Sequence, residues 1–274
     1  MELNAHACGS WKGVLWPNCY EAMKAAIRHG FLHIELDVSV TADGKFVIGH
    51  DSADKKIKDI SEREWLEWKM PWNGRRMNLA DALDVLRANP AVNVMWDFRP
   101  GAYDDCGNDI KRFACTLMSS NLPKPGIIEV YSWNDYYSLV SVGYDGIMYG
   151  LCGRGWVGNG IHCTRQQLES DMDECERRQV RNVSAPEFVV REYPSFIGKM
   201  HQSGCKVYSL GWEKKSSVHD AEMLGVDFAT VNFAVPGGFC KNLVRKCIER
   251  MWSLATRMQR KIKNHLRGLK WRES

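Results

Sequence analysis

The 274-residue chain lacks several features that would assign it to a class of protein at once. No apolar run approaches the roughly 20 residues of a membrane-spanning helix. The first residues, MELNAHACGSWKG, have neither the charged start nor the apolar core of a signal peptide. We therefore expect a cytoplasmic protein, whose contact with a membrane, if it makes one, is peripheral.

Other motifs are also absent. No predicted strand is followed by GxGxxG or GxxxxGK, so the common nucleotide-binding loops are missing. The ten cysteines include no Cys-x-x-Cys pair, and a chain of this length can bury a sizeable core without disulfide bonds. The sequence therefore predicts reduced thiols.

The net charge of +4 is unevenly distributed. Residues 241–274 contain eleven Lys or Arg against two Glu, which gives this segment +9 and leaves the other 240 residues with 4 − 9 = −5. Because Trp, Leu and Met are interspersed among these basic residues, a solvated helix face and contact with an anionic membrane surface both fit the pattern. Nucleic acid is not expected as a partner, because no recognition motif accompanies the basic residues.

The body of the chain alternates between strand-like and helix-like segments. The pattern predicts eight parallel strands separated by helices, which favours a closed (β/α)₈ TIM barrel over residues 1–240, followed by a basic C-terminal helix over 241–274 that packs on the barrel or extends from it. An open doubly wound sheet is the alternative, but it would be expected to carry a nucleotide-binding loop. The predicted strands start near residues 3, 33, 93, 127, 146, 181, 206 and 228.

One stretch, FLHIELDVSVTADGKFVIGHD at 31–51, departs from this alternation. Apolar residues alternate with Glu35, Asp37 and Ser39, which is the period of a strand and places both carboxylates on one face. Asp43-Gly44 predicts a hairpin turn, and the returning strand at 46–48 brings His50 roughly level with Asp37. We therefore predict a β-hairpin after the second barrel strand, with two acids and an imidazole at one end.

In a barrel of this kind the chemistry lies where the strands end. The polar or aromatic residues predicted at those ends are His6, Glu35, Asp37, Asp97, Arg99, Glu129, Tyr131, Trp212 and Asn232. His50 of the hairpin joins them. Each of them taken singly has a plain structural explanation. An acid can be a satisfied structural residue, and the Tyr131 and Trp212 rings can belong to the core.

Their conjunction indicates a particular chemistry. Neighbouring carboxylates repel one another unless a cation lies between them, and oxygen ligands without Cys or His suit Mg²⁺ or Ca²⁺. Two histidines beside such an ion can serve as a general acid and a general base. Arg99, on the same face as Asp97, offers a guanidinium that matches phosphate geometry. Together these groups suggest phosphoryl transfer.

The same residues resemble the glycerophosphodiester phosphodiesterase family, whose pattern is AHRG, PEN, IELDV, T-DG and HD. The corresponding segments here are AHACG, Pro17-Asn18 and IELDVSVTADGKFVIGHD, with fainter similarity at LADAL, WDFR and GVDFATV. The resemblance implies a (β/α)₈ fold, one divalent metal, and hydrolysis of a small phosphodiester to glycerol phosphate and an alcohol in lipid metabolism. It further implies His6 and His50 as acid and base, Glu35 and Asp37 as metal ligands, and Asp97 and Arg99 where the family usually has Glu and Lys.

The sequence also departs from the family pattern. Ala7 replaces the Arg that helps to hold the phosphate, and Pro17 directly precedes Asn18, so the Glu between them is missing. TVN at 230–232 replaces the usual TD. We therefore expect Glu35, Asp37 and Asp97 to bind the metal, and Arg99, Asn18, Glu129, Tyr131 and Trp212 to contribute to substrate binding.

Two alternatives remain open. The first is a phosphotransferase similar to the sphingomyelinase D enzymes, which also lack an Arg after the first His; it would release a cyclic phosphate. The second is a catalytically weak barrel that binds a phosphorylated headgroup.

Overall fold

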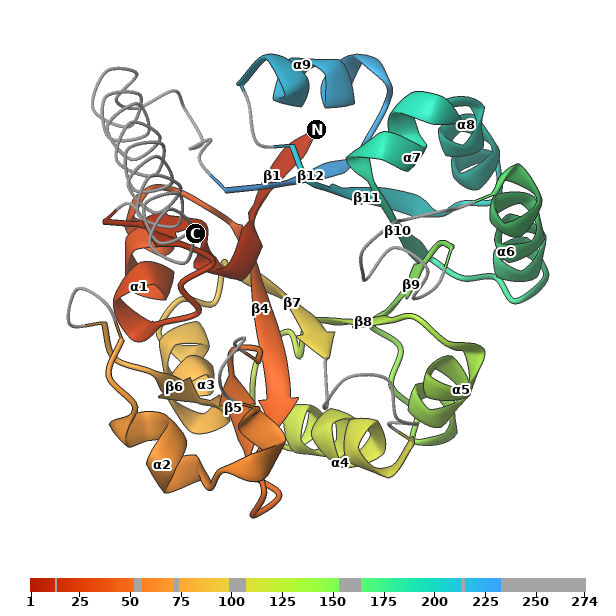
Figure 1. Cartoon of the computed structure of the whole chain (residues 1–274). Helices are drawn as coiled ribbons and strands as arrows, with labels where there is room; N and C mark the ends of the chain where they lie inside the picture. Colours follow the sequence, from red (N-terminus) through yellow and green to blue (C-terminus); the bar gives the residue numbers. More distant parts are fainter. Residues whose placement is uncertain are drawn as a thin grey trace, which may run out of the picture. The chain divides into compact units, whose positions relative to one another are not determined.

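Eight parallel strands close into a barrel in the computed structural model (Figure 1). The structure describes residues 1–12, 14–51, 56–70, 74–98, 107–152, 164–212 and 215–232. The first barrel strand pairs with both the second and the last, which closes the ring. In chain order the barrel strands are β1 (Glu2–Ala5), β4 (His33–Val40), β7 (Asn93–Phe98), β8 (Ile127–Val130), β9 (Ile147–Gly150), β10 (Asn182–Pro186), β11 (Lys206–Leu210) and β12 (Phe228–Val231).

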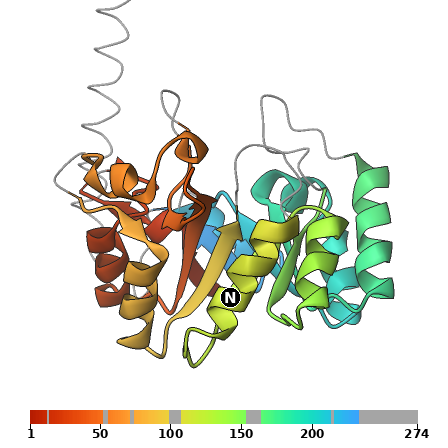
Figure 2. The ribbon, with the colours of Figure 1, turned by 90° about the horizontal axis from the view of Figure 1, so that it is seen from below.

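The barrel confirms the predicted fold class, and each strand begins within one residue of its predicted start. Helices surround the ring of strands (Figures 1 and 2). None of the helices in the described part of the chain is long and apolar enough to cross a bilayer. The helices between barrel strands are α1 (Tyr20–Arg28), α3 (Leu79–Arg87), α4 (Gly107–Met118), α5 (Trp133–Ser141), α6 (Arg165–Arg177), α7 (Glu187–Glu192), α8 (Ser195–Gln202) and α9 (Lys215–Met223).

The predicted hairpin forms as a side excursion from β4. Strand β5 (Phe46–Ile48) pairs antiparallel with β4 and then with β6 (Met77–Asn78), and Gly44 takes the positive φ of +72° that its turn requires. Between β5 and β6 lie a 3₁₀ turn (Ile57–Asp59) and helix α2 (Glu62–Glu67). A small cluster of Val47, Ile57, Ile60 and Trp65 fills the space beneath them.

The alternation in β4 divides its side chains between two environments. Ile34, Leu36 and Val38 are fully buried in the main hydrophobic cluster, which lies between the strands and the helices. The side chains between them face the barrel interior, where a separate cluster of Met95, Met148, Tyr208 and Phe228 fills the centre. One strand therefore supplies both the core that stabilises the barrel and the acids of the site.

Several expectations need correction. The sequence over 187–203 predicts a single helix, but the structure has two there, because Pro194 has no amide hydrogen to continue the ladder of α7. Cys152 is disulfide-bonded, so the expectation of reduced cysteines throughout is wrong there, and a disulfide is uncommon in cytosolic proteins. Of the described cysteines, five are free thiols.

Some predictions fall outside the described residues. Residues 153–160 are glycine-rich and predict a loop, and they lie there, as does the basic segment 241–274. The barrel belongs to the compact unit Met1–Pro236. The domain boundary near residue 240 and the membrane contact of the basic segment stay predictions.

Gly126 offers a test of the packing beside β7. It has a φ of +98°, and an added Cβ would lie 2.6 Å from Val94 Cγ1 and 2.7 Å from both Val94 O and Trp96 Nε1. Gly126→Ala should therefore destabilise the protein by about 2 to 4 kcal/mol in urea unfolding followed by circular dichroism. Gly198→Ala is the matched control, because Gly198 lies within α8 with no atom within 4 Å of the added Cβ. This variant should gain about 0.5 to 1 kcal/mol, and equal losses in both variants would contradict the assignment.

Candidate active site

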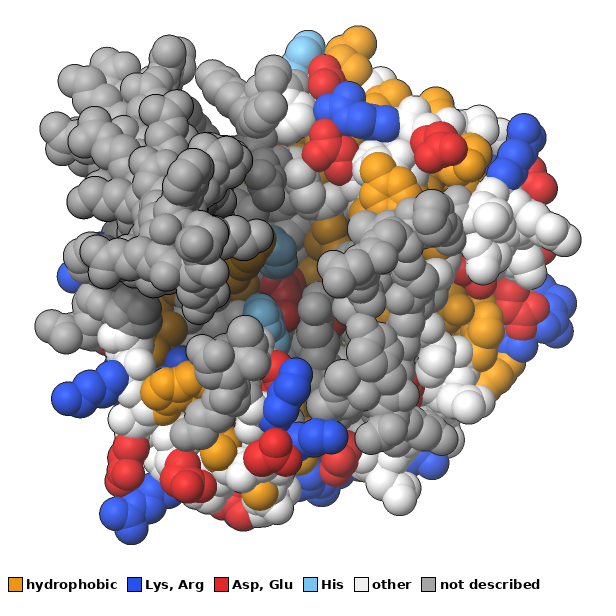
Figure 3. All heavy atoms as spheres, in the orientation of Figure 1, with side chains coloured by type: hydrophobic (Ala, Val, Ile, Leu, Met, Phe, Trp, Pro, Cys, Tyr) orange, Lys and Arg blue, Asp and Glu red, His pale blue; other side chains and the backbone are white. Residues whose placement is uncertain are grey.

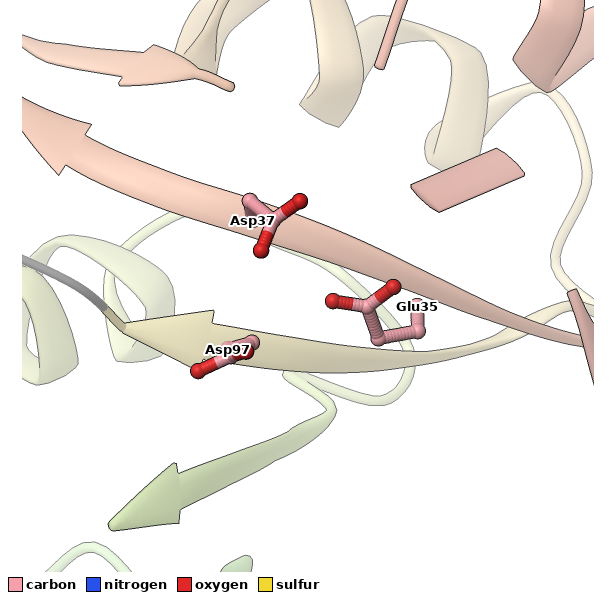
Figure 4. A group of neighbouring side chains, drawn as sticks. All are labelled: Glu35, Asp37 and Asp97. Carbon is pink, nitrogen blue, oxygen red and sulfur yellow. The ribbon is translucent and has the colours of Figure 1, made fainter. Parts of the chain in front are cut away.

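Three buried carboxylates meet where β4 and β7 run side by side. Asp37 pairs with Asp97 across these strands, and Glu35 lies one pleat earlier on β4. Their side chains point toward one another across the gap between the strands (Figure 4). One ligand oxygen from each residue lies within 4.8 Å of the others, and all three residues are at most 2% exposed. The structure thus brings the three predicted metal ligands together.

The donor set suits a hard divalent cation. Mg²⁺ and Ca²⁺ bind carboxylate oxygens at roughly 2.1 and 2.4 Å, so two oxygens on one ion lie at most about 4 to 5 Å apart. The separations within this cluster of acids fall inside that limit. The three side chains supply only oxygen ligands, which favours these cations over zinc.

Asn18 holds one of these carboxylates in place. Its Nδ2 donates a hydrogen bond of 2.5 Å to Asp37 Oδ2, and the Asp37 amide donates one of 3.3 Å to Asn18 Oδ1. The sequence predicts a helix that opens at Asn18, and a contribution of Asn18 to substrate binding. Helix α1 instead begins at Tyr20, and Asn18 takes a φ of +40° that turns its side chain to Asp37.

His6 follows β1 directly and lies in a network with Asn232 and Trp16. His6 Nδ1 is 2.9 Å from Asn232 Oδ1, and Trp16 Nε1 is 3.0 Å from the same oxygen and 3.1 Å from His6 Nδ1. Indole nitrogen can only donate, and its two acceptors within reach are Asn232 Oδ1 and His6 Nδ1. We assign the donation to the nearer Asn232 Oδ1, so that this oxygen also accepts from His6 Nδ1–H and the neutral imidazole carries its lone pair on Nε2. This tautomer is assigned from the hydrogen-bond network.

His50 is placed by its own backbone surroundings. Its Nδ1 lies 2.7 Å from the Asp51 carbonyl oxygen, which can only accept, so Nδ1 is the donor and Nε2 carries the lone pair. The preceding residue, Gly49, donates its amide to the Asp37 carbonyl at 2.8 Å. In the β4–β5 register Gly49 therefore stands opposite Asp37, and His50 lies one residue further than the level predicted for it.

Ala7 occupies the position where the family has its phosphate-holding Arg. Its amide donates a hydrogen bond to Glu35 Oε2, and its side chain is fully buried. The backbone at Ala7 takes a φ of +46° and a ψ of +43°, which is uncommon for a residue with a Cβ. The segment that presents His6 is thus tied by its backbone to the carboxylate of Glu35.

The remaining predicted site residues differ in position. Tyr131 approaches the cluster, with its hydroxyl 3.4 Å from Asp97 Oδ1, and its ring packs on Gly150, where an added Cβ would clash. Glu129 stands beside Asp97 in the β7–β8 register, is 1% exposed and accepts a hydrogen bond from Ser184 Oγ. Trp212 is fully buried in the main hydrophobic cluster, away from the interior cluster of the barrel. Arg99 lies outside the described residues.

Histidine and acidic side chains lie together at the centre of one face of the molecule (Figure 3). Close to them, burial raises the pKa of the Cys8 thiol well above its usual value, and the nearby Cys19, Glu35 and Asp37 raise it further. Cys8 therefore stays a neutral thiol behind the acids, and it adds no charge to the site.

Trp16 was not predicted as part of the site. Asn232 was noted only as a polar strand end. Asn232 could have been paired with His6 from the sequence, because β1 and β12 are neighbours in a closed barrel. No signal in the sequence identifies Trp16, since its contact depends on a φ of +52° in an irregular loop.

Comparison with known proteins connects this geometry to a family. Residues 12–99 match the family model of the glycerophosphoryl diester phosphodiesterase family. The match includes Glu35, Asp37, His50 and Asp97, and it begins after His6. Over these residues the chain is similar to this family. Members of the family are phosphoric diester hydrolases.

Solved structures of this family share the fold at low sequence identity. A glycerophosphodiester phosphodiesterase from Parabacteroides distasonis superposes with a TM-score of 0.70 and 16% identity, covering 93% of this chain and 98% of that one. A phosphodiesterase from Oleispira antarctica, in complex with the product sn-glycerol-3-phosphate, gives 0.66 and 16% over 85% and 93%. The enzyme from Thermotoga maritima gives 0.61 and 15% over 84% and 93%. No curated protein sequence matches the chain significantly.

Asn18 allows a test of how Asp37 is oriented. Asn18→Gly removes both side-chain hydrogen bonds but tolerates the positive φ. Loss of such an orienting partner typically lowers metal affinity about 10- to 100-fold, and titration calorimetry with Mg²⁺ or Ca²⁺ measures it. Asn121→Gly is the control, because Asn121 also has a positive φ, of +57°, but is exposed on the surface. Equal affinity in the two variants would show that Asn18 does not orient the ligand.

Proposed function

We propose that the protein is a metal-dependent phosphodiesterase that cleaves a glycerophosphodiester-type substrate to glycerol phosphate and an alcohol. The observation that supports the proposal is that two histidines lie beside one cluster of acids. The residue after His6 donates its amide to Glu35, and the residue before His50 donates its amide to the Asp37 carbonyl. Both imidazoles are thereby tied by the backbone to the strand that carries two of the three carboxylates.

The cluster of acids is the proposed metal site. Glu35, Asp37 and Asp97 would hold one divalent cation, Mg²⁺ or Ca²⁺, which when bound offsets negative charge on the phosphoryl oxygens. Asn18 keeps one Asp37 oxygen in a fixed direction. The Tyr131 hydroxyl lies beside the Asp97 carboxylate.

The two histidines are the proposed acid and base. Each imidazole donates from Nδ1 to an oxygen, His6 to Asn232 and His50 to the Asp51 carbonyl, so each uses Nε2 for proton transfer. One takes a proton from the nucleophile, which is water in the hydrolytic reaction. The other acts as an imidazolium, protonated on Nε2 as well, and gives that Nε2 proton to the oxygen of the departing alcohol. Arg99 is proposed to assist with phosphate binding.

His6→Ala and His50→Ala test this mechanism. Each variant should lose about 10²- to 10⁴-fold in kcat, because general acid or base catalysis contributes that much. ³¹P NMR with glycerophosphocholine, glycerophosphoethanolamine and glycerophosphoglycerol as substrates, in Mg²⁺ or Ca²⁺, measures turnover. It also separates a linear phosphate monoester from a cyclic product.

The control for these variants is His219→Ala, because His219 is an exposed residue of α9 and its side chain is 71% accessible. This variant should retain wild-type turnover. Full activity in both His6→Ala and His50→Ala would refute the acid–base assignment. Absence of turnover by the wild-type protein with every diester would refute the proposed function itself.

The exposed indole of Trp16 provides a finer test. Trp16→Phe keeps an aromatic ring beside His6 and removes the N–H that donates to Asn232. Without this donor the Asn232 amide is free to flip and present its nitrogen to His6, which selects the other tautomer. We expect kcat to fall about tenfold while KM changes less than twofold. Trp11→Phe in the same loop is the control, and a KM effect alone would point to substrate contact instead of positioning.

A further inference from the structure

Arg76 is held between two indole rings in the excursion that follows His50. Its guanidinium carbon lies 3.9 Å from the ring centroid of Trp65 and 4.3 Å from that of Trp68. The two rings are perpendicular, with centroids 5.7 Å apart, and Arg76 Nε donates a hydrogen bond of 3.2 Å to the Trp68 carbonyl. Stacking and this hydrogen bond fix both the plane and the direction of the guanidinium.

The guanidinium has no acidic partner among the described residues. No ion pair of the described chain includes Arg76, and its two terminal nitrogens make no hydrogen bond there. The neighbouring Arg75, by contrast, pairs with Asp81 at 2.9 Å. Burial lowers the pKa of Arg76 to about 10, because the charge is desolvated without a carboxylate to offset it. A fixed and partly buried cation of this kind favours an incoming oxyanion.

The β-ladder places Arg76 near the cluster of acids. Gly49 stands opposite Asp37 in the β4–β5 register. The last pair of β5 and β6 is Ile48 with Met77, so the next position along this register places Arg76 opposite Gly49. On its other side Arg76 bridges to Cys19, the neighbour of Asn18. Two strand spacings correspond to about 10 Å between the backbones of Asp37 and Arg76.

Trp65 connects the two positions on the same face of this ladder. An added Cβ on Gly49 would lie 2.6 Å from the Trp65 ring, so the ring covers Gly49 directly. The guanidinium of Arg76 stacks on that same ring. Three groups therefore follow one another across this face: the Asp37 carboxylate, which would hold the metal, the Trp65 indole and the Arg76 guanidinium.

We propose that Arg76 binds a second anionic group of the substrate, a phosphate or a carboxylate, at a point whose backbone lies about 10 Å from that of Asp37. This inference rests on the proposed function and narrows its substrate to diesters that carry an additional negative charge on one alcohol. The planar fork of Arg76 offers two terminal nitrogens to such a group, which is the geometry of a bidentate contact. Trp65 and Trp68 keep the fork from turning away.

The test compares two substrates in the presence of the activating metal. One is glycerophosphoglycerol, and the other is the same diester with a phosphate monoester on its terminal hydroxyl. In Arg76→Gln, kcat/KM for the phosphorylated diester should fall about 10- to 100-fold, because hydrogen bonds to charged groups have that strength. The value for glycerophosphoglycerol should stay within twofold. Arg75→Gln, one residue away, should leave the ratio of the two substrates unchanged.

Arg76→Lys covers the case in which Arg76→Gln fails to fold, as judged by circular dichroism. It keeps the charge and loses the fork, so it should lose about 3- to 10-fold on the phosphorylated diester alone. Equal losses on both substrates, or the same change of ratio in Arg75→Gln, would overturn the inference and leave the proposed function standing.

Inorganic phosphate gives a readout that does not depend on turnover. Phosphate should raise the thermal midpoint of the wild type and of Arg75→Gln more than that of Arg76→Lys. If the wild type cleaves neither diester, the proposed function fails, and this titration still decides whether Arg76 binds an oxyanion. The same shift in all variants would overturn the inference.

Discussion

The close approach of three buried carboxylates is the constraint on which the site depends. Glu35, Asp37 and Asp97 are almost fully buried, and their ligand oxygens converge within 4.8 Å. Like charges at that separation in a medium of low dielectric repel strongly, so the arrangement requires compensation. The barrel provides part of it through N–H groups, since the Ala7 amide binds Glu35 and the Asn18 side chain binds Asp37. A divalent cation is the natural further compensation, and the site is built from oxygen ligands that suit one.

The loop after β1 adapts to this cluster at the cost of backbone strain. Ala7, Cys8, Lys12, Trp16 and Asn18 all take positive φ values, although none of them is glycine. Each such residue costs of order 1 kcal/mol or more, and conformations of this kind concentrate at functional sites. In return the loop directs one amide and one carboxamide at the acids and one indole at the His6–Asn232 pair. At Ala7, where the family pattern has a long Arg, the side chain is small and fully buried.

Side-chain positions that depend on strand periodicity could be predicted from the sequence, whereas the side-chain contacts made by this loop could not. Alternation in β4 placed Glu35 and Asp37 on the interior face, and the barrel topology then brought Asp97 beside them. By contrast, the Asn18 contact needs a left-handed residue before α1, where the helix-start pattern suggested a cap. The break at Pro194 between α7 and α8 follows from proline chemistry, because proline has no amide hydrogen to donate to the helix ladder. The arrangement of Trp16 follows from no local rule, because it joins a strained loop to the end of the last strand.

The distribution of positive charge distinguishes this barrel from the family pattern it resembles. The pattern places an Arg directly after the first histidine, where this chain has the small, buried Ala7. Arg76 stands in the excursion instead, fixed by two indoles and in line with Asp37 across the β-ladder. Under the proposed function, a cation beside the first histidine would act on the phosphate that reacts, whereas Arg76, whose backbone lies about 10 Å from that of Asp37, would act on a different part of the substrate. A cation at the first position would serve every phosphodiester, whereas one at the second would distinguish among them.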